Sequence, residues 1–158
     1  MKRIILLALS STLALSAHAE GILPEQSETM KQLINIYANK VKADAAAAAA
    51  ANPNKIQPVK AEEFSAESGR QIYLKSRNWE GEEQAACATC HTDDPKNVGK
   101  HAISRKSIYP LAPVANLHRF TNAEKVEMNF GLHCHELYNR DCTAAEKGHI
   151  LTYLLSVK

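Results

Sequence analysis

The stretch Cys87-Ala88-Thr89-Cys90-His91 decides how the rest of the sequence is interpreted. It matches the pattern C-x-x-C-H, which attaches haem covalently. The spacing has a chemical reason: two thiols add to the two vinyl groups of the haem, and the adjacent histidine then reaches the iron from one face. The sequence therefore predicts one covalent haem c, attached through Cys87 and Cys90, with His91 as an iron ligand.

Two other kinds of site contain a C-x-x-C pair, and the sequence favours neither. A thioredoxin-like redox pair follows a strand in a βαβ unit, and no such alternation is present. Half of a zinc site needs a second pair of ligands at suitable spacing. The remaining cysteines, Cys134 and Cys142, are eight residues apart, which suits zinc poorly.

The first nineteen residues have the three parts of a secretory signal. Lys2 and Arg3 are basic, residues 4–15 are apolar, and Ala17-His18-Ala19 suits a signal peptidase. An apolar run of about twelve residues is too short to span a membrane, which takes roughly twenty. We therefore expect cleavage after Ala19, a periplasmic location and no membrane span in the mature chain.

Charge and length restrict the classes of function. The chain has 19 Lys and Arg against 17 Asp and Glu, and the first nineteen residues contain two of the basic residues and no acidic one. The mature chain is therefore close to neutral, so we expect no nucleic-acid partner. A mature length of about 139 residues suits one domain.

The N-terminal region predicts a helix that begins at Pro24. Five apolar residues recur there at helical spacing and form one stripe: Met30, Leu33, Ile34, Tyr37 and Val41. The alanine run 45–51 favours helix but offers no large apolar stripe. We interpret residues 44–60 as an exposed linker or an extension of the helix. The expected division is a signal peptide at 1–19, an N-terminal helix with its alanine-rich linker at 20–60, and a main domain at 61–158.

Three further helices are expected in the main domain. The first covers about residues 66–76, with Ser65 as its N-cap, and places Gly69 and Tyr73 on one face. The second, opened by Thr121, covers about 122–137. The last follows Cys142, and Thr143-x-x-Glu forms a capping box at its start. No alternating strand pattern is present, so the expected fold class is all-α.

The second iron ligand has several candidates: His101, His118, Met128, His133, His135 and His149. Methionine would raise the reduction potential and histidine would hold it lower. His133 is the favoured candidate because it shares one helical face with three apolar residues, Val126, Phe130 and Leu137. His135 should point roughly the opposite way, and Met128 lies on another stripe. The alternative for His133 is a core histidine without a metal.

Cys134 and Cys142 bracket a short segment beside His133. In an oxidising compartment a pair of cysteines that no cofactor uses should form a disulfide; the alternative is two unpaired thiols. A loop of this size contributes about 2.5 kcal/mol to stability in the chain-entropy model. We expect the disulfide to fix the backbone that presents His133.

Two levels of resemblance follow from these residues. Gly69, Tyr73, the C-x-x-C-H motif and Tyr153 resemble class I cytochromes c, a resemblance that implies that the first and last helices of the domain cross where a glycine lets them touch. Residues 87–155 resemble more closely the cytochrome c″ and sphaeroides haem protein family. The segments that carry this closer resemblance are CATCHT at 87–92, NVGK at 97–100, PLAP at 110–113, RFT at 119–121, KVE at 125–127, HC at 133–134 and DC at 141–142.

The resemblance implies a class I cytochrome c-like fold around one haem, with an extra N-terminal helix in this chain. It also implies an unusual distal ligand immediately before the first disulfide cysteine: asparagine in the sphaeroides haem protein branch and histidine in the cytochrome c″ branch. His133 places this chain in the histidine branch. In that branch the distal histidine detaches on reduction, and electron uptake is coupled to protons. A free imidazole provides the physical route, since its pKa lies near physiological pH.

The function we expect is electron transfer, not enzymatic catalysis, with other redox proteins of the periplasm as partners. The iron would be ligated by His91 and His133 when ferric. A different class of function follows from the same feature. A ferrous haem that has released His133 has an open site, so binding or sensing of O2, NO or CO, or reduction of O2 or NO, is the alternative.

Overall fold

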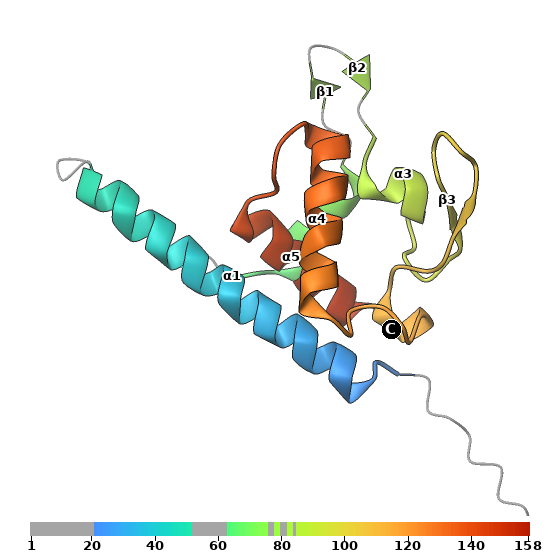
Figure 1. The fold of residues 1–158 in the computed structure, drawn as a ribbon, viewed down its shortest axis with the longest axis horizontal. Coiled ribbons are helices and arrows are strands. Elements are labelled where there is room, and N and C mark those ends of the chain that lie inside the picture. Colours follow the sequence, from blue (N-terminus) through green and yellow to red (C-terminus); the bar gives the residue numbers. More distant parts are fainter. Residues whose placement is uncertain (1–20, 52–62, 76–77, 80–81, 84) are drawn as a thin grey trace, which may run out of the picture.

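The computed structural model describes residues 21–51, 63–75, 78–79, 82–83 and 85–158. Over these residues helices carry the fold (Figure 1), as the all-α prediction required: α1 (Pro24–Ala51), α2 (Ala66–Leu74), α3 (Cys87–His91), α4 (Ala123–Tyr138), α5 (Ala144–Ser156) and the short 3-10 helix η1 (Pro113–Ala115). The expected signal peptide, residues 1–19, and the expected domain boundary after residue 60 lie outside the described residues.

Two small antiparallel hairpins join the helices. β1 (Asn78–Trp79) pairs with β2 (Glu82–Glu83), and β3 (Gly99–Lys100) pairs with β4 (Ser107–Ile108). Strands of two residues are too short to produce an alternating pattern, so neither hairpin is predicted from the sequence.

The first and last helices of the main domain, α2 and α5, cross in direct contact at Gly69. A Cβ built on Gly69 would lie 2.0 Å from the His149 carbonyl oxygen and 2.7 Å from Tyr153 Cβ. Only a residue without a side chain permits this approach. Beside the crossing, the rings of Tyr73 and Tyr153 pack with their centroids 5.4 Å apart. This is the helix crossing that the resemblance to class I cytochromes c implied.

Local capping explains where the helices begin. Ser65 caps α2 by accepting a hydrogen bond from the Ser68 N–H at 3.1 Å, as predicted. The predicted capping box of α5 is present, with Thr143 and Glu146 bonded reciprocally. One prediction was wrong by a residue: Asn122, not Thr121, caps α4, because the Asn122 side chain accepts from the Lys125 N–H at 2.8 Å. α2 also ends at Leu74, earlier than expected.

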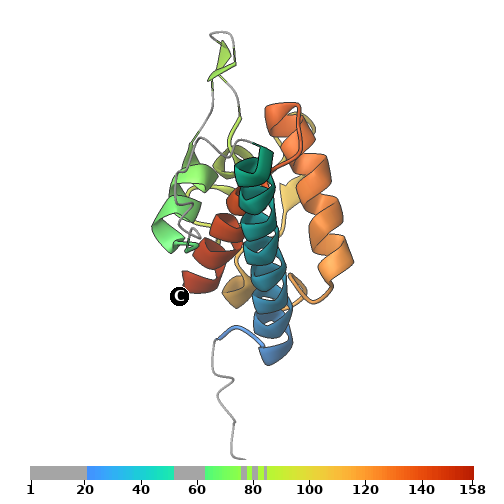
Figure 2. The same cartoon turned by 90° about the vertical axis from the view of Figure 1, so that its left-hand side faces the viewer.

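The predicted apolar stripe of α1 packs against α5 and, less extensively, against α4 (Figure 2). Met30, Leu33 and Tyr37 are buried. Glu127 of α4 links the three helices, since it accepts hydrogen bonds from the Tyr37 hydroxyl and from Lys147 Nζ, the latter at 2.7 Å. α1 is thus part of the packed structure and not a separate appendage.

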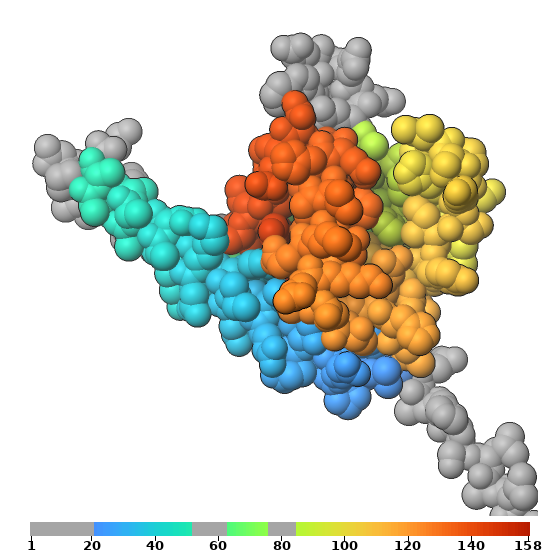
Figure 3. Space-filling model, in the orientation of Figure 1, coloured from blue at the N-terminus to red at the C-terminus, as the bar shows by residue number. Residues whose placement is uncertain are grey.

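The alanine run continues α1 as helix to Ala51, and this end extends away from the rest of the molecule (Figures 1 and 3). Of the two interpretations of residues 44–60, helix extension is correct as far as Ala51, and residues 52–60 are not described. No helix in the described part of the chain combines the length and the apolar character needed to cross a membrane.

Candidate cofactor site

A pocket of about 540 Å³ lies between α3, α4 and the segment that contains the β3–β4 hairpin. This volume is within the range of small-molecule and cofactor sites. Most of the lining is apolar, with contributions from α2 and α5 at the back. All four residues predicted to bind the cofactor line it: Cys87, Cys90, His91 and His133.

The C-x-x-C-H motif forms the short helix α3. The Ala86 N–H donates to Thr89 Oγ1 at 2.8 Å and stabilises the first turn. Cys87 and Cys90 are free thiols one helical turn apart. Burial raises the pKa of the Cys87 thiol to about 11; a backbone hydrogen bond opposes this shift, and the nearby Cys90 contributes less in the same direction as burial. At neutral pH the Cys87 side chain is therefore a thiol, the form that adds across a vinyl group.

Two contacts fix the backbone around His91. The Tyr73 hydroxyl donates hydrogen bonds to the carbonyl oxygens of His91 and Thr92, at 3.1 and 2.7 Å. On the other side Gly99 packs against α3, and a Cβ at this position would lie 2.0 Å from the Cys90 carbonyl oxygen. Glycine is needed at 99 because the β3 backbone passes directly over the end of α3.

The His91 ring presents one nitrogen to the pocket. Its Nδ1 is fully buried, with no hydrogen-bond partner among the described residues, which leaves Nε2 as the accessible nitrogen. Burial lowers the pKa of His91 to about 4, and the positive charge of Arg119 and the proximity of His133 contribute less. The ring is therefore neutral, which is the form that binds metals.

His133 faces His91 across the pocket. The two ring centroids are 6.4 Å apart and the ring planes are inclined by 81°. A metal bound by both rings would give a similar separation, about 6.2 Å, from two bonds of about 2 Å and about 1.1 Å between each ring centre and its nitrogen. The His133 Nδ1 lies 3.0 Å from Glu136 Oε2, so Nε2 is the nitrogen left for a metal.

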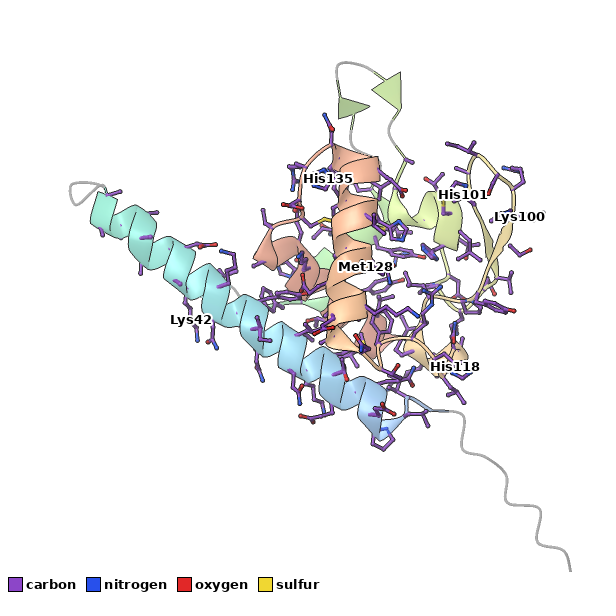
Figure 4. The ribbon with its side chains drawn as sticks, in the orientation of Figure 1. Lys42, Lys100, His101, His118, Met128 and His135 are labelled. Carbon is purple, nitrogen blue, oxygen red and sulfur yellow. A yellow bond between two sulfur atoms is a disulfide. The ribbon has the colours of Figure 1, made fainter. Side chains whose placement is uncertain are left out.

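The helical face predicted for α4 is the one that lines the pocket, through Val126, Phe130, His133 and Leu137. Met128 and His135 do not line it. Met128 is 56% exposed, and His135 Nε2 lies 3.1 Å from Asp141 Oδ1 at the surface. Figure 4 shows both labelled side chains on α4.

The remaining histidines have other surroundings. His149 is buried between α2 and α5, where its Nδ1 accepts from the Ser65 N–H at 3.0 Å. His101 and His118 line the pocket from the segment opposite α4 (Figure 4). His101 Nδ1 accepts from the Ser104 N–H at 3.1 Å, and His118 is exposed.

Cys134 and Cys142 form a disulfide with their Cα atoms 5.5 Å apart. Both are buried and pack against Tyr138, Phe130 and Leu137. The disulfide ties the last turns of α4, which carry His133, to the short segment just before α5. Since both sulfurs are bonded to each other, this pair is not available as zinc-binding thiolates.

Arg119 lines the same pocket and was not singled out by the sequence analysis as a site residue. Its guanidinium donates to the carbonyl oxygens of Pro110 and Tyr109, at 3.3 and 3.2 Å. Burial lowers the pKa of Arg119, and no carboxylate pairs with it among the described residues. The pocket thus holds a partly buried cation that would be stabilised by a ligand with an acidic group.

The arrangement suits haem. It combines two free thiols, two facing imidazoles at the separation that one metal ion requires, an apolar lining and a cation without a carboxylate partner. Glu136 was also missed by the sequence analysis, although its position three residues after His133 on a helix is a recognisable pairing signal.

Comparison with known proteins points the same way. The profile of a family described as a domain of unknown function (DUF1924) matches residues 59–154. Cytochrome c″ from Methylophilus methylotrophus is 48% identical over 73 residues, which are 46% of this chain and 51% of that protein. The chain thus matches about half the length of that relative. Cytochrome c-type protein SHP from Cereibacter sphaeroides is 37% identical over 89 residues, 56% of this chain and 68% of that protein.

Solved structures of the same two proteins share the fold. The crystal structure of oxidised cytochrome c″ superposes with a TM-score of 0.64 at 34% identity, over 83% of this chain and 96% of that one. The structure of oxidised SHP, described as an oxygen-binding cytochrome c, gives a TM-score of 0.59 at 32% identity, over 79% and 94%. The chain therefore belongs to the family of cytochrome c″ and SHP, whose members are cytochromes c.

Proposed function

We propose that this chain is a periplasmic monohaem cytochrome c that carries electrons, exported by a signal peptide cleaved after Ala19. Cys87 and Cys90 hold the haem through thioether bonds, and His91 and His133 are the two iron ligands in the ferric state. One observation carries the proposal: the rings of His91 and His133 face each other with 6.4 Å between centroids, beside the two free thiols of the attachment motif.

The bound haem supplies a one-electron couple between ferric and ferrous iron. The chain's own residues supply the surroundings. The apolar side chains of α4 and α5 exclude water from the macrocycle. Arg119 would hold an acidic group of the haem, since among the described residues its half-buried guanidinium is bonded to backbone carbonyls and to no carboxylate. Tyr73 and Gly99 fix the backbone that presents His91.

We further propose that His133 leaves the iron on reduction. Two features support this. Among the described residues the hydrogen bond of the His133 ring is to Glu136 of the same helix, so a movement of the ring away from the iron would break no hydrogen bond to another element. An imidazole that leaves a metal can bind a proton on the nitrogen it frees, and the Glu136 carboxylate lies 3.0 Å from the other ring nitrogen of His133. Electron uptake is then coupled to proton uptake.

A second candidate function is binding of a small gas such as O2, NO or CO in the space that His133 vacates. It is favoured by one relative in particular, since SHP is described as an oxygen-binding cytochrome c. Electron transfer and gas binding would use the same site, and they differ in whether a gas molecule binds there after reduction. A reductase acting on O2 or NO belongs to the same candidate.

Two experiments test the proposal. Extraction with acidified organic solvent should leave the haem with the protein, and recovery of most of the haem in the solvent would contradict covalent attachment. Ferric protein should be low-spin with two imidazoles, and ferrous protein largely high-spin and five-coordinate. A ferrous form that stays low-spin at every pH would contradict release but leave the ligand assignment intact. Rapid CO or NO binding to the ferrous form would favour the second function.

Matched variants identify the distal ligand. His133→Ala should make the ferric iron high-spin or water-ligated. His135→Ala, two residues away on the outer side of α4, and Met128→Leu should both leave it low-spin, because neither side chain lines the pocket. The assignment would be rejected by an absorption band typical of methionine ligation in the wild type, or by a low-spin ferric His133→Ala variant.

A further inference from the structure

The segment opposite α4 has an unusual charge distribution. Residues 95–123 contain five Lys and Arg and no Asp or Glu, whereas the whole chain has 19 and 17. The rest of the chain therefore has an acidic excess. The basic segment includes the β3–β4 hairpin and the residues that follow it up to the start of α4. Such a one-sided distribution produces a local positive potential on a nearly neutral protein.

Three of the basic residues of this segment lie on the hairpin itself. Lys100, Arg105 and Lys106 are exposed and form no ion pair in the described part of the chain. The other two differ: Lys96 donates to the Lys158 carbonyl oxygen at 2.7 Å, and Arg119 lies in the pocket lining. The hairpin charges are therefore free to act on another molecule.

The same hairpin exposes large apolar side chains. Ile103 at its turn is 88% exposed, and Val98 at its start is 60% exposed. Apolar groups surrounded by charged ones are typical of protein interaction surfaces, with an apolar centre and a polar rim. We call residues 98–109 the basic hairpin.

The basic hairpin is next to the cofactor pocket. His101, Ile108 and Tyr109 line that pocket, and the three cations lie on the same hairpin. In Figure 3 the hairpin (yellow) forms a projecting lobe beside α4 (orange). A protein bound to this lobe would therefore lie beside the pocket that would hold the haem.

We propose that the basic hairpin is the docking surface for an acidic redox protein, with Lys100, Arg105 and Lys106 steering the approach and Ile103 forming the apolar centre. The inference rests on the proposed electron-carrier function and names the surface and the charge of the partner. Complementary charge raises association rates and orients the encounter, and this effect weakens with salt.

The test uses haem-loaded full-length mature protein and two reductants. The first is an acidic flavodoxin in its hydroquinone state, which gives one electron to the ferric protein and becomes the semiquinone. The second is reduced lumiflavin, which has the same flavin chemistry without an acidic protein surface. The variants are the triple charge reversal Lys100→Glu, Arg105→Glu, Lys106→Glu and the control Lys31→Glu, Lys40→Glu, Lys42→Glu. The control variant changes the net charge by the same amount as the hairpin variant, but at exposed positions of α1, which are remote from the hairpin (Figure 4).

At low ionic strength the triple charge reversal on the hairpin should lower the second-order rate constant for reduction by flavodoxin by at least about tenfold. It should also flatten or invert the salt dependence, while the α1 triple changes the rate by less than about twofold. Lumiflavin should reduce all forms equally. Ile103→Ser should lower the flavodoxin rate without changing the salt dependence, since it removes only the apolar centre.

An equal loss in both triples would overturn the proposal, because net charge alone would explain it. No loss in the hairpin triple would also overturn it. So would unchanged flavodoxin rates together with lost binding to phosphatidylglycerol vesicles, which would assign the hairpin to a membrane surface. If lumiflavin fails to reduce the wild type, the electron-carrier function itself fails, a result distinct from loss of docking alone.

Discussion

His133 and Glu136 lie one turn apart on α4, with the imidazole Nδ1 3.0 Å from the carboxylate Oε2. A carboxylate in this position fixes the orientation of a metal-binding imidazole and raises the basicity of its other nitrogen. His91 has no such partner, since its buried Nδ1 has no hydrogen bond in the described structure. The imidazoles of His133 and His91 thus differ in their strength as electron-pair donors to a metal, because His133 has a carboxylate partner and His91 has none in the described structure.

Glu136→Gln should weaken His133 as a ligand. The loss of the negative charge lowers the basicity of Nε2, and carboxylates that hydrogen-bond to a metal-binding imidazole typically contribute about 10–100-fold to metal affinity. Because the stronger donor favours ferric iron, the midpoint potential should rise and part of the ferric protein should become high-spin. Potentiometric titration at fixed pH and ferric EPR spectra measure the two effects.

Asp141→Asn is the matched control for that experiment, because His135 and Asp141 form a similar pair, 3.1 Å apart, outside the pocket. It should leave potential and spin state unchanged. If the two variants behave alike, or if Glu136→Gln leaves both readouts at wild-type values, the carboxylate has no influence on the ligand.

The midpoint potential should fall as pH rises. Under the proposed release of His133, the reduced protein holds one more proton than the oxidised protein. Removing protons from solution therefore disfavours the reduced state. One proton per electron gives a slope of at most about 59 mV per pH unit. In the His133→Ala variant the part of this slope that comes from the imidazole should be absent. A wild-type potential that is independent of pH between 5 and 9 would argue against coupling through this residue.

Much of the site was predictable because it depends on local patterns. The C-x-x-C-H spacing identified three residues that line the pocket, and the positions of Val126, Phe130 and His133 identified the face of α4 that meets it. Capping residues located the starts of α2 and α5. Each of these signals operates within a few turns of helix, so one sequence is sufficient to detect it.

The parts that were missed depend on contacts between distant segments. Gly99 is required because β3 passes over the Cys90 carbonyl, and no local pattern in residues 95–105 indicates which backbone lies there. The inward position of Arg119 likewise depends on how the loop before α4 folds over the pocket. Glu136 is the exception, because its spacing from His133 was visible in the sequence.

Gly69→Ala should destabilise the holoprotein strongly, while Gly131→Ala should not. The added methyl group at 69 would lie 2.0 Å from the His149 carbonyl oxygen, so α2 and α5 would have to separate. Overpacking of this kind costs about 1–3 kcal/mol or more. At 131, in the interior of α4, a Cβ meets no atom within 4 Å, and alanine should stabilise the helix by about 0.5–1 kcal/mol. Guanidinium unfolding of both variants gives the comparison; equal effects would contradict close contact at the crossing.

Removal of the disulfide should affect both stability and ligation. Cys134 and Cys142 are buried, with 4% and 7% exposure, so alanine is a better replacement than serine, which would bury a hydroxyl group. The double variant should lose about 2.5 kcal/mol of unfolding free energy, from the entropy of the short loop that the bond closes.

The effect of the disulfide on iron ligation follows from its position next to His133. Cys134 directly follows His133, and the bond to Cys142 ties the end of α4 to the start of α5. Without that bond the last turns of α4 can fray, so a larger fraction of ferric iron should be high-spin in the double variant. His135→Ala, which leaves the disulfide intact, should show neither change. Thiol counting on denatured, unreduced wild type should find no reactive cysteine; two per chain would show that the bond is absent. If the double variant loses stability but keeps a wild-type ferric spectrum, the disulfide stabilises the fold without positioning His133.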